Sequence, residues 1–372
     1  MNRPSPSPFT VYRSPFTLYR FTVHRSRCTF SPVPHAPLSP NILAVRFSSI
    51  GDILLTTPLL RAIRHAHPGA RITVLTKREF VPLLSHNPNV HRVIGLAPGR
   101  SLLRLAAELR GEGYTNLLDL HDNLRSRALR LLVPGRWRTY PKHRLARALL
   151  IHGKRNRYRD RRPVPERYFS AARDLGLAPD GHPPEFFVGA EASEQVAAWL
   201  ASAGLASEPN IVAMAPGAAH ATKRWPLEHW RTLVDRAGRD GLAVVFVGGP
   251  NDAALGAALS DAARARVANA AGVFGLQATG ALLKRARSLV SGDTGVMHMA
   301  TGVGTPVVAL FGPTVEAFGF FPYASQATVL ELPLPCRPCT SQGGPRCPLG
   351  HHRCLVDIEP GIAYEALGRS LR

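Results

Sequence analysis

The sequence is poor in three features, and each shortage narrows the class of protein. Only five of its 372 residues are cysteine, and four of these lie between Cys336 and Cys354, which excludes a secreted disulfide framework and favours a reducing compartment. No apolar run approaches the roughly 18 residues that a membrane-spanning helix needs. Acidic residues number 25 against 46 Lys and Arg, giving a formal net charge of +21. So basic a chain is expected to meet an anionic partner: nucleic acid, a membrane surface or a small polyanionic substrate.

Residues 1–40 lack the pattern of a folded segment. The stretch "SPFTVYRSPFTLYRFTVHR" repeats a seven-residue unit, and residues 1–40 carry five arginines without one acidic residue. The arginines interrupt the apolar stretch that a secretory signal needs, although an organellar transit peptide has this composition too. We interpret residues 1–40 as a disordered or mis-started extension.

From residue 41 onward, short apolar runs typical of buried strands alternate with helical patterns. Runs such as "NILAVR" and "ARITVLT" predict one sheet within residues 41–190, and runs such as "NIVAMAPG" and "TPVVALFG" predict a second within residues 191–357. Residues 358–372 are expected to form a C-terminal helix. The alternation indicates parallel sheets with right-handed crossovers. The predicted fold is α/β, with two Rossmann-like domains whose strand ends face a central cleft.

A single carboxylate follows the first predicted strand. In "AVRFSSIGDILLTTP", Gly51 and Asp52 lie in a turn at the carboxyl end of that strand, where ligands bind in open α/β sheets. Taken alone, Asp52 could be an exposed turn residue that binds its own backbone. Its position also suits a general base in a cleft.

Two later stretches suit the binding of an anion. In "APGAAHATKRWP", Gly217 ends a strand and is followed by Lys223 and Arg224, a pair that suits a pyrophosphate. In "SGDTGVMHMATG", Asp293 ends another strand and Thr294, Gly295 and His298 open a helix, whose free N–H groups and dipole favour an anion. Alternatively, the basic pair is a solvated loop and Asp293 or Thr294 merely caps the helix.

Other enzyme classes are disfavoured. One Asp-Thr-Gly cannot supply the paired carboxylates of an aspartic protease, and the absence of Gly-x-Gly-x-x-Gly and of a P-loop disfavours dehydrogenases and NTPases.

Together, "RFSSIGDILLTTPLLRAI", "DLHDNLRSRAL", "PGAAHATKRWP", "GDTGVMHMATGVGTPVVALFGPT" and the late "CRPC…CP…GHHRC" resemble glycosyltransferase family 9, which contains the lipopolysaccharide heptosyltransferases. The resemblance runs from about residue 41 to residue 360. It implies a GT-B fold with an acceptor-binding N-terminal domain and a nucleotide-sugar-binding C-terminal domain. It also implies inverting, metal-independent transfer from ADP-heptose to a Kdo or heptose hydroxyl of the inner core.

The resemblance also implies roles for individual residues. Asp52 matches the catalytic aspartate. Donor-binding positions are matched by Gly51, Gly217, Lys223, Arg224, Asp293, Thr294, Gly295 and His298. Family members often carry a Glu near the ribose, where this chain has Pro250-Asn251-Asp252. The contacts to the ribose and adenine are therefore open.

Positive charge is concentrated in one stretch. Between Arg125 and Arg167 there are 15 Lys or Arg and two acidic residues. Because helical periodicity is poor there, we expect much of it to be loop over the acceptor side of the cleft, with Arg125, Arg127 and Arg144 binding the acceptor. Kdo carboxylates, lipid A phosphates and an anionic membrane surface would supply the counter-charge. No RNA-binding motif accompanies the stretch, so a nucleic-acid partner is disfavoured.

The four clustered cysteines follow the spacing Cys336-x2-Cys339-x7-Cys347-x6-Cys354. This spacing suits a tetrahedral structural zinc, with free thiols or a disulfide as alternatives. The resemblance implies that catalysis requires no cofactor. We therefore expect a cytoplasmic, monomeric GT-B glycosyltransferase, peripheral on the inner membrane. A family member with another nucleotide sugar and surface glycan is the alternative within the class, and a basic nucleic-acid-binding protein the alternative outside it.

Overall fold

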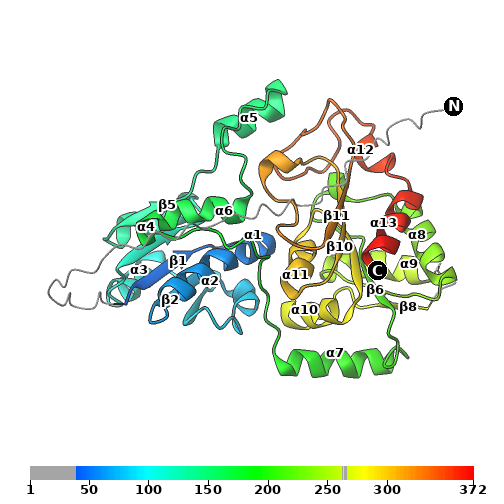
Figure 1. Cartoon of the computed structure of the whole chain (residues 1–372), viewed down its shortest axis with the longest axis horizontal. Helices are drawn as coiled ribbons and strands as arrows, with labels where there is room; N and C mark the ends of the chain where they lie inside the picture. The colour runs from blue at the N-terminus through cyan, green and yellow to red at the C-terminus, as the bar shows by residue number, and fades with distance from the viewer. Residues whose placement is uncertain (1–38, 262, 264–265) are drawn as a thin grey trace, which may run out of the picture.

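The computed structural model describes residues 39–261, 263 and 266–372. They form two α/β halves that lie side by side, each built on its own parallel sheet (Figure 1). The extension expected over residues 1–40 falls almost wholly outside the described residues. The prediction of a two-sheet parallel α/β fold is confirmed.

The N-terminal half contains a five-stranded sheet in the order β3-β2-β1-β4-β5. Its strands are β1 (Asn41–Val45), β2 (Arg71–Lys77), β3 (Arg92–Leu96), β4 (Asn116–Asp119) and β5 (Trp137–Thr139). Its helices are α1 (Ile50–Leu54), α2 (Thr57–Ala66), α3 (Leu102–Arg110), α4 (Leu124–Leu132), α5 (Arg144–Gly153) and α6 (Val164–Tyr168), with short 3-10 turns at η1 (Arg78–Leu83) and η2 (Phe169–Leu175). Alternate residues of β1 enter different cores: Ile42 and Ala44 pack with Leu59 of α2, whereas Leu43 and Val45 pack with Leu105 of α3. Burial on both faces explains why the strand reads as a continuous apolar run.

The C-terminal half contains a six-stranded sheet in the order β11-β10-β9-β6-β7-β8. Its strands are β6 (Ile211–Ala215), β7 (Ala243–Phe246), β8 (Val267–Asn269), β9 (Ser288–Gly292), β10 (Val307–Phe311) and β11 (Ala327–Glu331). Its helices are α7 (Ala190–Ser202), α8 (Leu227–Arg239), α9 (Ala253–Asp261), α10 (Leu276–Arg285), α11 (Gly295–Val303), α12 (Arg353–Val356) and α13 (Pro360–Ser370), with 3-10 turns at η3 (Ala221–Lys223), η4 (Pro250–Asp252) and η5 (Glu316–Phe318). The C-terminal helix α13 packs against α8 and the strands of this half.

The sequence patterns missed the three short edge strands β5, β8 and β11. The expectation that much of the basic stretch 125–167 is loop is met in part: α4, β5, α5 and α6 occupy more than half of it, whereas residues 154–163 lie outside these elements. Exposed arginines such as Arg127 of α4 and Arg144 of α5 obscure the apolar periodicity of these helices. No helix among the described residues is long and apolar enough to cross a membrane.

Several contacts join the two halves among the described residues. Helix α1 packs against α11. The linker before α7 is held by Arg61 of α2, which forms ion pairs with Asp180 at 2.6 Å and Glu185 at 3.0 Å. On the α5 side, Lys154 donates hydrogen bonds to the backbone oxygens of Cys336 and Pro338. The carboxyl ends of β1 and β9 therefore lie near one another, across the contact of α1 with α11.

Candidate functional site at the contact of the two halves

Asp52 lies in the first turn of α1, the helix that follows β1. Its Oδ2 accepts hydrogen bonds from the backbone N–H of Ser49 at 3.2 Å and from the Ser49 hydroxyl at 2.9 Å. Its Oδ1 pairs with Nη2 of Arg46 at 2.5 Å. Both carboxylate oxygens are thus held by donors from the turn between β1 and α1, which fixes the side chain in one orientation.

The environment keeps Asp52 ionised. Burial by itself would raise the pKa of this carboxyl, but the Arg46 charge and the hydrogen bonds from Ser49 outweigh it, so the pKa lies below the usual value. Arg46 remains charged because the same pair raises its own pKa above normal despite burial. Asp52 is therefore a carboxylate at neutral pH, the form that can accept a proton.

Arg46 is itself fixed by the surrounding backbone. Its guanidinium donates to the carbonyl oxygens of Ser48 at 2.8 Å and Leu120 at 2.6 Å, and to the Tyr140 hydroxyl at 3.3 Å. Only 6% of the residue is exposed. The resemblance had not assigned it a role, although it lies in the same motif as Asp52.

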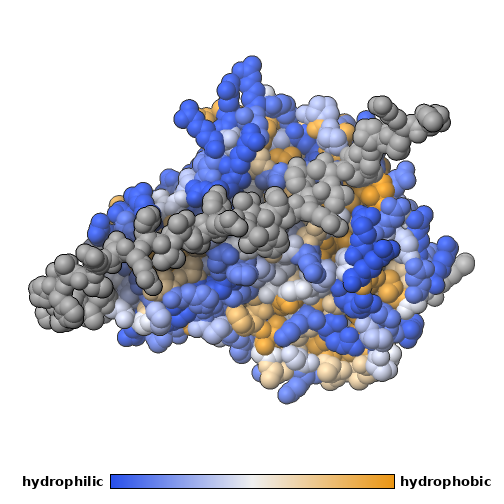
Figure 2. Space-filling model, in the orientation of Figure 1, coloured by the Kyte–Doolittle hydropathy of each residue, from blue (hydrophilic) through white to orange (hydrophobic). Residues whose placement is uncertain are grey.

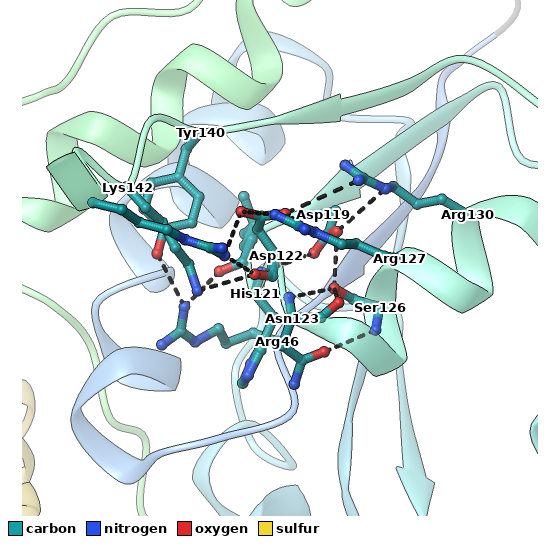
Figure 3. Close-up of polar contacts among 12 residues, drawn as sticks. Arg46, Asp119, His121, Asp122, Asn123, Ser126, Arg127, Arg130, Tyr140 and Lys142 are labelled. Atoms are coloured by element: carbon teal, nitrogen blue, oxygen red, sulfur yellow. Dashed lines mark hydrogen bonds and ion pairs between the residues drawn. The ribbon is translucent and has the colours of Figure 1, made fainter.

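Next to this pair, a basic cluster surrounds Asp122 (Figure 3). Asp119, at the end of β4, accepts hydrogen bonds from the backbone N–H groups of His121 and Asp122, and so shapes the turn before α4. Asp122 then pairs with Arg127 of α4 at 2.9 Å and with Arg144 of α5 at 2.8 Å. Two of the three predicted acceptor residues are thereby brought together.

The third predicted acceptor residue, Arg125, lies apart from this cluster. Its guanidinium stands over the ring of Phe47, 6.0 Å from the centroid. Phe47 is the residue after Arg46, so Arg125 still lies on the side of α4 that faces the β1 turn.

The basic cluster is strongly electropositive. Burial, followed by the charges of Arg46 and Arg144, lowers the pKa of Lys142 to about 8. Burial and then Arg46 lower the pKa of His121 to about 3. Lys142 donates only to the backbone oxygen of Asp122, at 3.4 Å, among the described residues. A bound anion would relieve this concentration of like charge.

On the other side of the contact, Lys223 and Asp293 form an ion pair. Nζ of Lys223 lies 2.7 Å from Oδ2 of Asp293, which also accepts a hydrogen bond from the Thr314 hydroxyl at 2.7 Å. Thr294 is the N-cap residue of α11, yet its hydroxyl bonds to Ser291, and the α11 N-terminus has no side-chain cap. The capping alternative for Asp293 and Thr294 is therefore not what this structure shows.

Small residues allow α1 and α11 to approach closely. A Cβ on Gly51 would collide with the ring of His298, and one on Gly295 would lie 2.8 Å from Cβ of Ile50. His298 is buried, and burial lowers the pKa of its imidazole. Gly51, Gly295 and His298 thus all lie in the packing between the two helices.

A second carboxylate lies close to Gly217. Asp252 accepts a hydrogen bond from the backbone N–H of Gly249 at 2.9 Å and lies so close to Gly217 that a Cβ there would collide with it. Arg224 points back and donates to the backbone oxygen of Ala218 at 2.9 Å. Asp252 therefore places a carboxylate at the ends of β6 and β7.

The cysteine-rich segment does not fit a metal as the structure places it. No group of three or more His, Cys, Asp or Glu among the described residues is arranged to hold an ion. Burial raises the pKa of Cys339, and it raises that of Cys354 to about 11, and both residues are free cysteines. Cys336 and Cys347 are free as well. We derive no metal chemistry from these four residues.

Comparisons with known proteins identify the family. Residues 102–348 match the model of glycosyltransferase family 9 (heptosyltransferase). The chain belongs to this family. It is therefore a glycosyltransferase.

Individual relatives extend the match to most of the chain. The lipopolysaccharide heptosyltransferase 2 of Salmonella typhimurium is 29% identical over 88% of this chain and 97% of its own length. Among solved structures, the family 9 glycosyltransferase of Veillonella parvula is 25% identical with a TM-score of 0.75, covering 90% of this chain and 97% of its own. The Escherichia coli ADP-heptose lps heptosyltransferase II is 27% identical with a TM-score of 0.69, covering 89% and 98%. The fold is GT-B.

Sequence reasoning missed several residues of this region, chiefly Arg46, His121, Asp122, Lys142 and Asp252. Arg46 and Asp122 stand inside the motifs that carried the resemblance, so a closer reading of those motifs could have found them. Lys142 lies between Pro141 and His143 with no recognisable pattern, and only the fold brings it to Asp122.

Proposed function

We propose that the protein transfers a heptose from ADP-heptose to a Kdo or heptose hydroxyl of the lipopolysaccharide inner core, with inversion at the anomeric carbon. The observation that carries the proposal is the opposition of Asp52 on α1 to Lys223 and the α11 N-terminus across one helix contact. A base and a phosphate site on facing elements are what direct displacement of a nucleoside diphosphate requires.

In this proposal Asp52 takes the proton of the acceptor hydroxyl as its oxygen attacks the anomeric carbon. The new C–O bond forms while the bond from the anomeric carbon to the β-phosphate oxygen breaks, and ADP leaves with the electron pair. Arg46 and Ser49 hold the Asp52 carboxylate in place during the transfer. The only group that the enzyme itself takes up is the proton of the acceptor hydroxyl.

The leaving diphosphate gains negative charge as the bond breaks. Lys223 is positioned to neutralise it, assisted by the uncapped first-turn N–H groups and the dipole of α11. We propose that these groups suffice without a divalent cation. Asp252, on the same edge of the sheet, is the carboxylate that we propose for the ribose hydroxyls.

The basic cluster around Asp122 is proposed to bind the anionic acceptor. Arg127, Arg144 and Lys142 converge there from α4, α5 and the segment between β5 and α5. Kdo carboxylates or lipid A phosphates would supply the missing negative charge. We place this reaction at the cytoplasmic face of the inner membrane, with the protein as a peripheral monomer.

The test combines a donor panel with one substitution. Calorimetry with ADP-heptose, a UDP-sugar and a GDP-sugar is expected to show binding of ADP-heptose alone. Asp52→Asn is expected to bind ADP-heptose normally and to lower kcat by at least about 10², the usual reach of general base catalysis. Asp261→Asn, at the exposed end of α9, serves as the control and is expected to be unchanged. Normal turnover by Asp52→Asn would remove this residue from the mechanism.

A further inference from the structure

Helix α5 has an apolar face that the described part of the protein leaves uncovered. Leu145 is 75% exposed and Leu149 is 40% exposed, and Ala148 between them is exposed as well. These residues are spaced by three or four positions and therefore share one side of the helix. Figure 1 shows α5 projecting beyond the body of the N-terminal half.

The opposite side of α5 is occupied. Leu150 packs with Tyr158 and with Phe318 of η5, in the C-terminal half. The Arg147 guanidinium stands 5.1 Å from the centroid of the Phe318 ring. Because these contacts fix the orientation of α5, Leu145 and Leu149 cannot turn inward without breaking them.

Helix α4 exposes two further leucines. Leu124 is 85% exposed and Leu131 is 88% exposed, and a spacing of seven residues puts them on the same side of the helix. Arg127, which stands between them, and Arg144 at the start of α5 both pair with Asp122. This shared carboxylate ties the beginnings of α4 and α5 together.

Positive charge continues directly from the end of α5. Residues 154–162 contain six Lys or Arg, all exposed, against the single acidic residue Asp160. In Figure 2 hydrophilic side chains flank hydrophobic ones on this projection. Arg155, Arg157, Arg159 and Arg161 have no ion-pair partner among the described residues, whereas Arg162 pairs with Asp160.

We propose that the exposed face of α5, with the arginines of residues 154–162, docks on a bilayer that contains anionic lipids. The leucines enter the boundary between headgroups and acyl chains, and the arginines bind the headgroup phosphates. A helix lying in the interface with leucine on one side and a polybasic segment beside it has both elements that peripheral membrane binding uses. The position also suits the reaction, because Arg144 at the first turn of α5 reaches the basic cluster beside Asp52.

An anionic bilayer accounts for exposed leucines beside exposed arginines better than a nucleic acid or a second copy of this chain does. A nucleic acid would use the arginines but leave the exposed leucines in water, at no gain. A second copy of this chain would bring an equally basic surface against this one, since the formal net charge is +21, and like charges would repel. A membrane offers hydrocarbon and phosphate within one layer.

The test is cosedimentation of the full-length protein with vesicles of phosphatidylcholine alone or with about one third phosphatidylglycerol. Leu145→Gln combined with Leu149→Gln is expected to lower the partition coefficient on the anionic vesicles at least tenfold. Arg155→Gln with Arg157→Gln is expected to lower it as well and to weaken its salt dependence. Val273→Gln, which changes a half-exposed apolar residue of the C-terminal half, is the matched control and is expected to bind as the wild type does.

Two further readouts make the outcome decisive. Leu145→Trp is expected to increase partitioning, because Trp favours the interface, which covers the case in which the double glutamine variant does not fold. Sedimentation velocity without vesicles is expected to show no change of mass in that variant, and a wild-type dimer that it dissociates would overturn the proposal. If the variant with Leu145→Gln and Leu149→Gln partitions as Val273→Gln does, the proposal is overturned too.

The docking surface itself does not depend on the proposed function; only its role, which is to bring the enzyme to a membrane-bound acceptor, rests on it. With a delipidated acceptor, the leucine variant is expected to keep wild-type kcat and KM, whereas with acceptor in vesicles its KM should rise. Vesicle binding without heptose transfer by the wild type would contradict the proposed function and leave the docking surface standing. Heptose transfer by a protein whose vesicle binding does not depend on the leucines would contradict the docking surface and leave the proposed function standing.

Discussion

The guanidinium of Arg46 lies 2.5 Å from the carboxylate of Asp52, and the two side chains are 7% and 19% exposed. One residue comes from the end of β1 and the other from the first turn of α1, so the pair closes the turn that carries the candidate base. Such a pair stabilises the ionised carboxylate against burial. We therefore expect the pair to affect both catalysis and stability.

Replacing Arg46 by Met should separate these effects. The pKa of Asp52 in the folded protein lies below its usual value, so the pair stabilises the fold at pH values above the unfolded-state pKa. That contribution is lost as the pH falls through the folded-state pKa. Arg46→Met is expected to raise the Asp52 pKa, to move the acid limb of kcat/KM to higher pH, and to destabilise the fold by about 3–5 kcal/mol, the cost of breaking a buried pair. Arg46→Lys keeps the charge and should show a smaller shift. An unchanged acid limb in Arg46→Met would mean that another group controls it.

The close approach of α1 to α11 depends on Gly51. A methyl group on this residue would meet the His298 ring, so Gly51→Ala is expected to cost about 1–3 kcal/mol in unfolding free energy, as overpacking does, and to lower kcat. Removing the ring as well, in Gly51→Ala with His298→Ala, should recover part of the lost stability. Gly153→Ala, where a Cβ meets nothing within 4 Å, is the control and should be neutral or slightly stabilising. Strict additivity of the two substitutions at the contact would show that their side chains do not meet in solution.

Lys223 is the cation that we assign to the donor diphosphate. Lys223→Ala is expected to weaken ADP-heptose binding by roughly 1.5–3 kcal/mol, the range for hydrogen bonds to charged groups, as measured by calorimetry. The exposed Lys284 of α10 offers a comparison of equal charge, and Lys284→Ala should bind the donor normally. If the donor Kd stays constant while acceptor KM rises, Lys223 belongs to the acceptor side instead.

The sequence predicted the buried central strands well and the edges poorly. Strands such as β1 and β6 are covered on both faces and read as apolar runs. Strands β5 and β8 have three residues each, too short to show a period. The residues that flank helix α5, His143 and Lys154, both have positive φ, and the helix has no side-chain cap. Neither end therefore carries the Ser, Thr, Asp, Asn or Gly that usually marks a helix end in a sequence.

The residues of the candidate site also fall into a group that the sequence predicted and a group that it did not. Asp52, Lys223 and Asp293 each lie in the segment that follows a strand, in a stretch with its own pattern, and the fold brings these segments to the contact of the two halves. Lys142 and Asp122 are 20 residues apart and meet through a hydrogen bond that no local pattern encodes. Residues whose role depends on a tertiary contact between unpatterned segments are the ones that sequence reasoning missed.

The three arginines predicted to bind the acceptor lie in two different settings. Arg127 and Arg144 share Asp122, whereas Arg125 lies over Phe47. Replacing each by Gln is expected to raise acceptor KM and leave donor affinity unchanged, and acceptor KM should rise with salt because exposed charges are screened over about 8 Å. Steady-state titration of both substrates at two salt concentrations checks this for each variant. Equal losses for donor and acceptor would mean that the arginines support the fold.

Lys142 gives the acceptor site a pH dependence of its own. Burial and then Arg46 and Arg144 lower its pKa to about 8, so the free enzyme loses this positive charge as the pH rises through about 8. An anionic acceptor stabilises the charged form, and its KM is therefore expected to increase above that pH while donor Kd stays level. Lys142→Arg keeps the charge at every accessible pH and should abolish the increase, whereas Lys142→Met should show a high KM throughout. The measurement is acceptor KM from pH 6.5 to about 9.5 in all three proteins, a range that spans the shifted lysine pKa. A rise that persists in Lys142→Arg would assign the titration to another group and separate Lys142 from the acceptor.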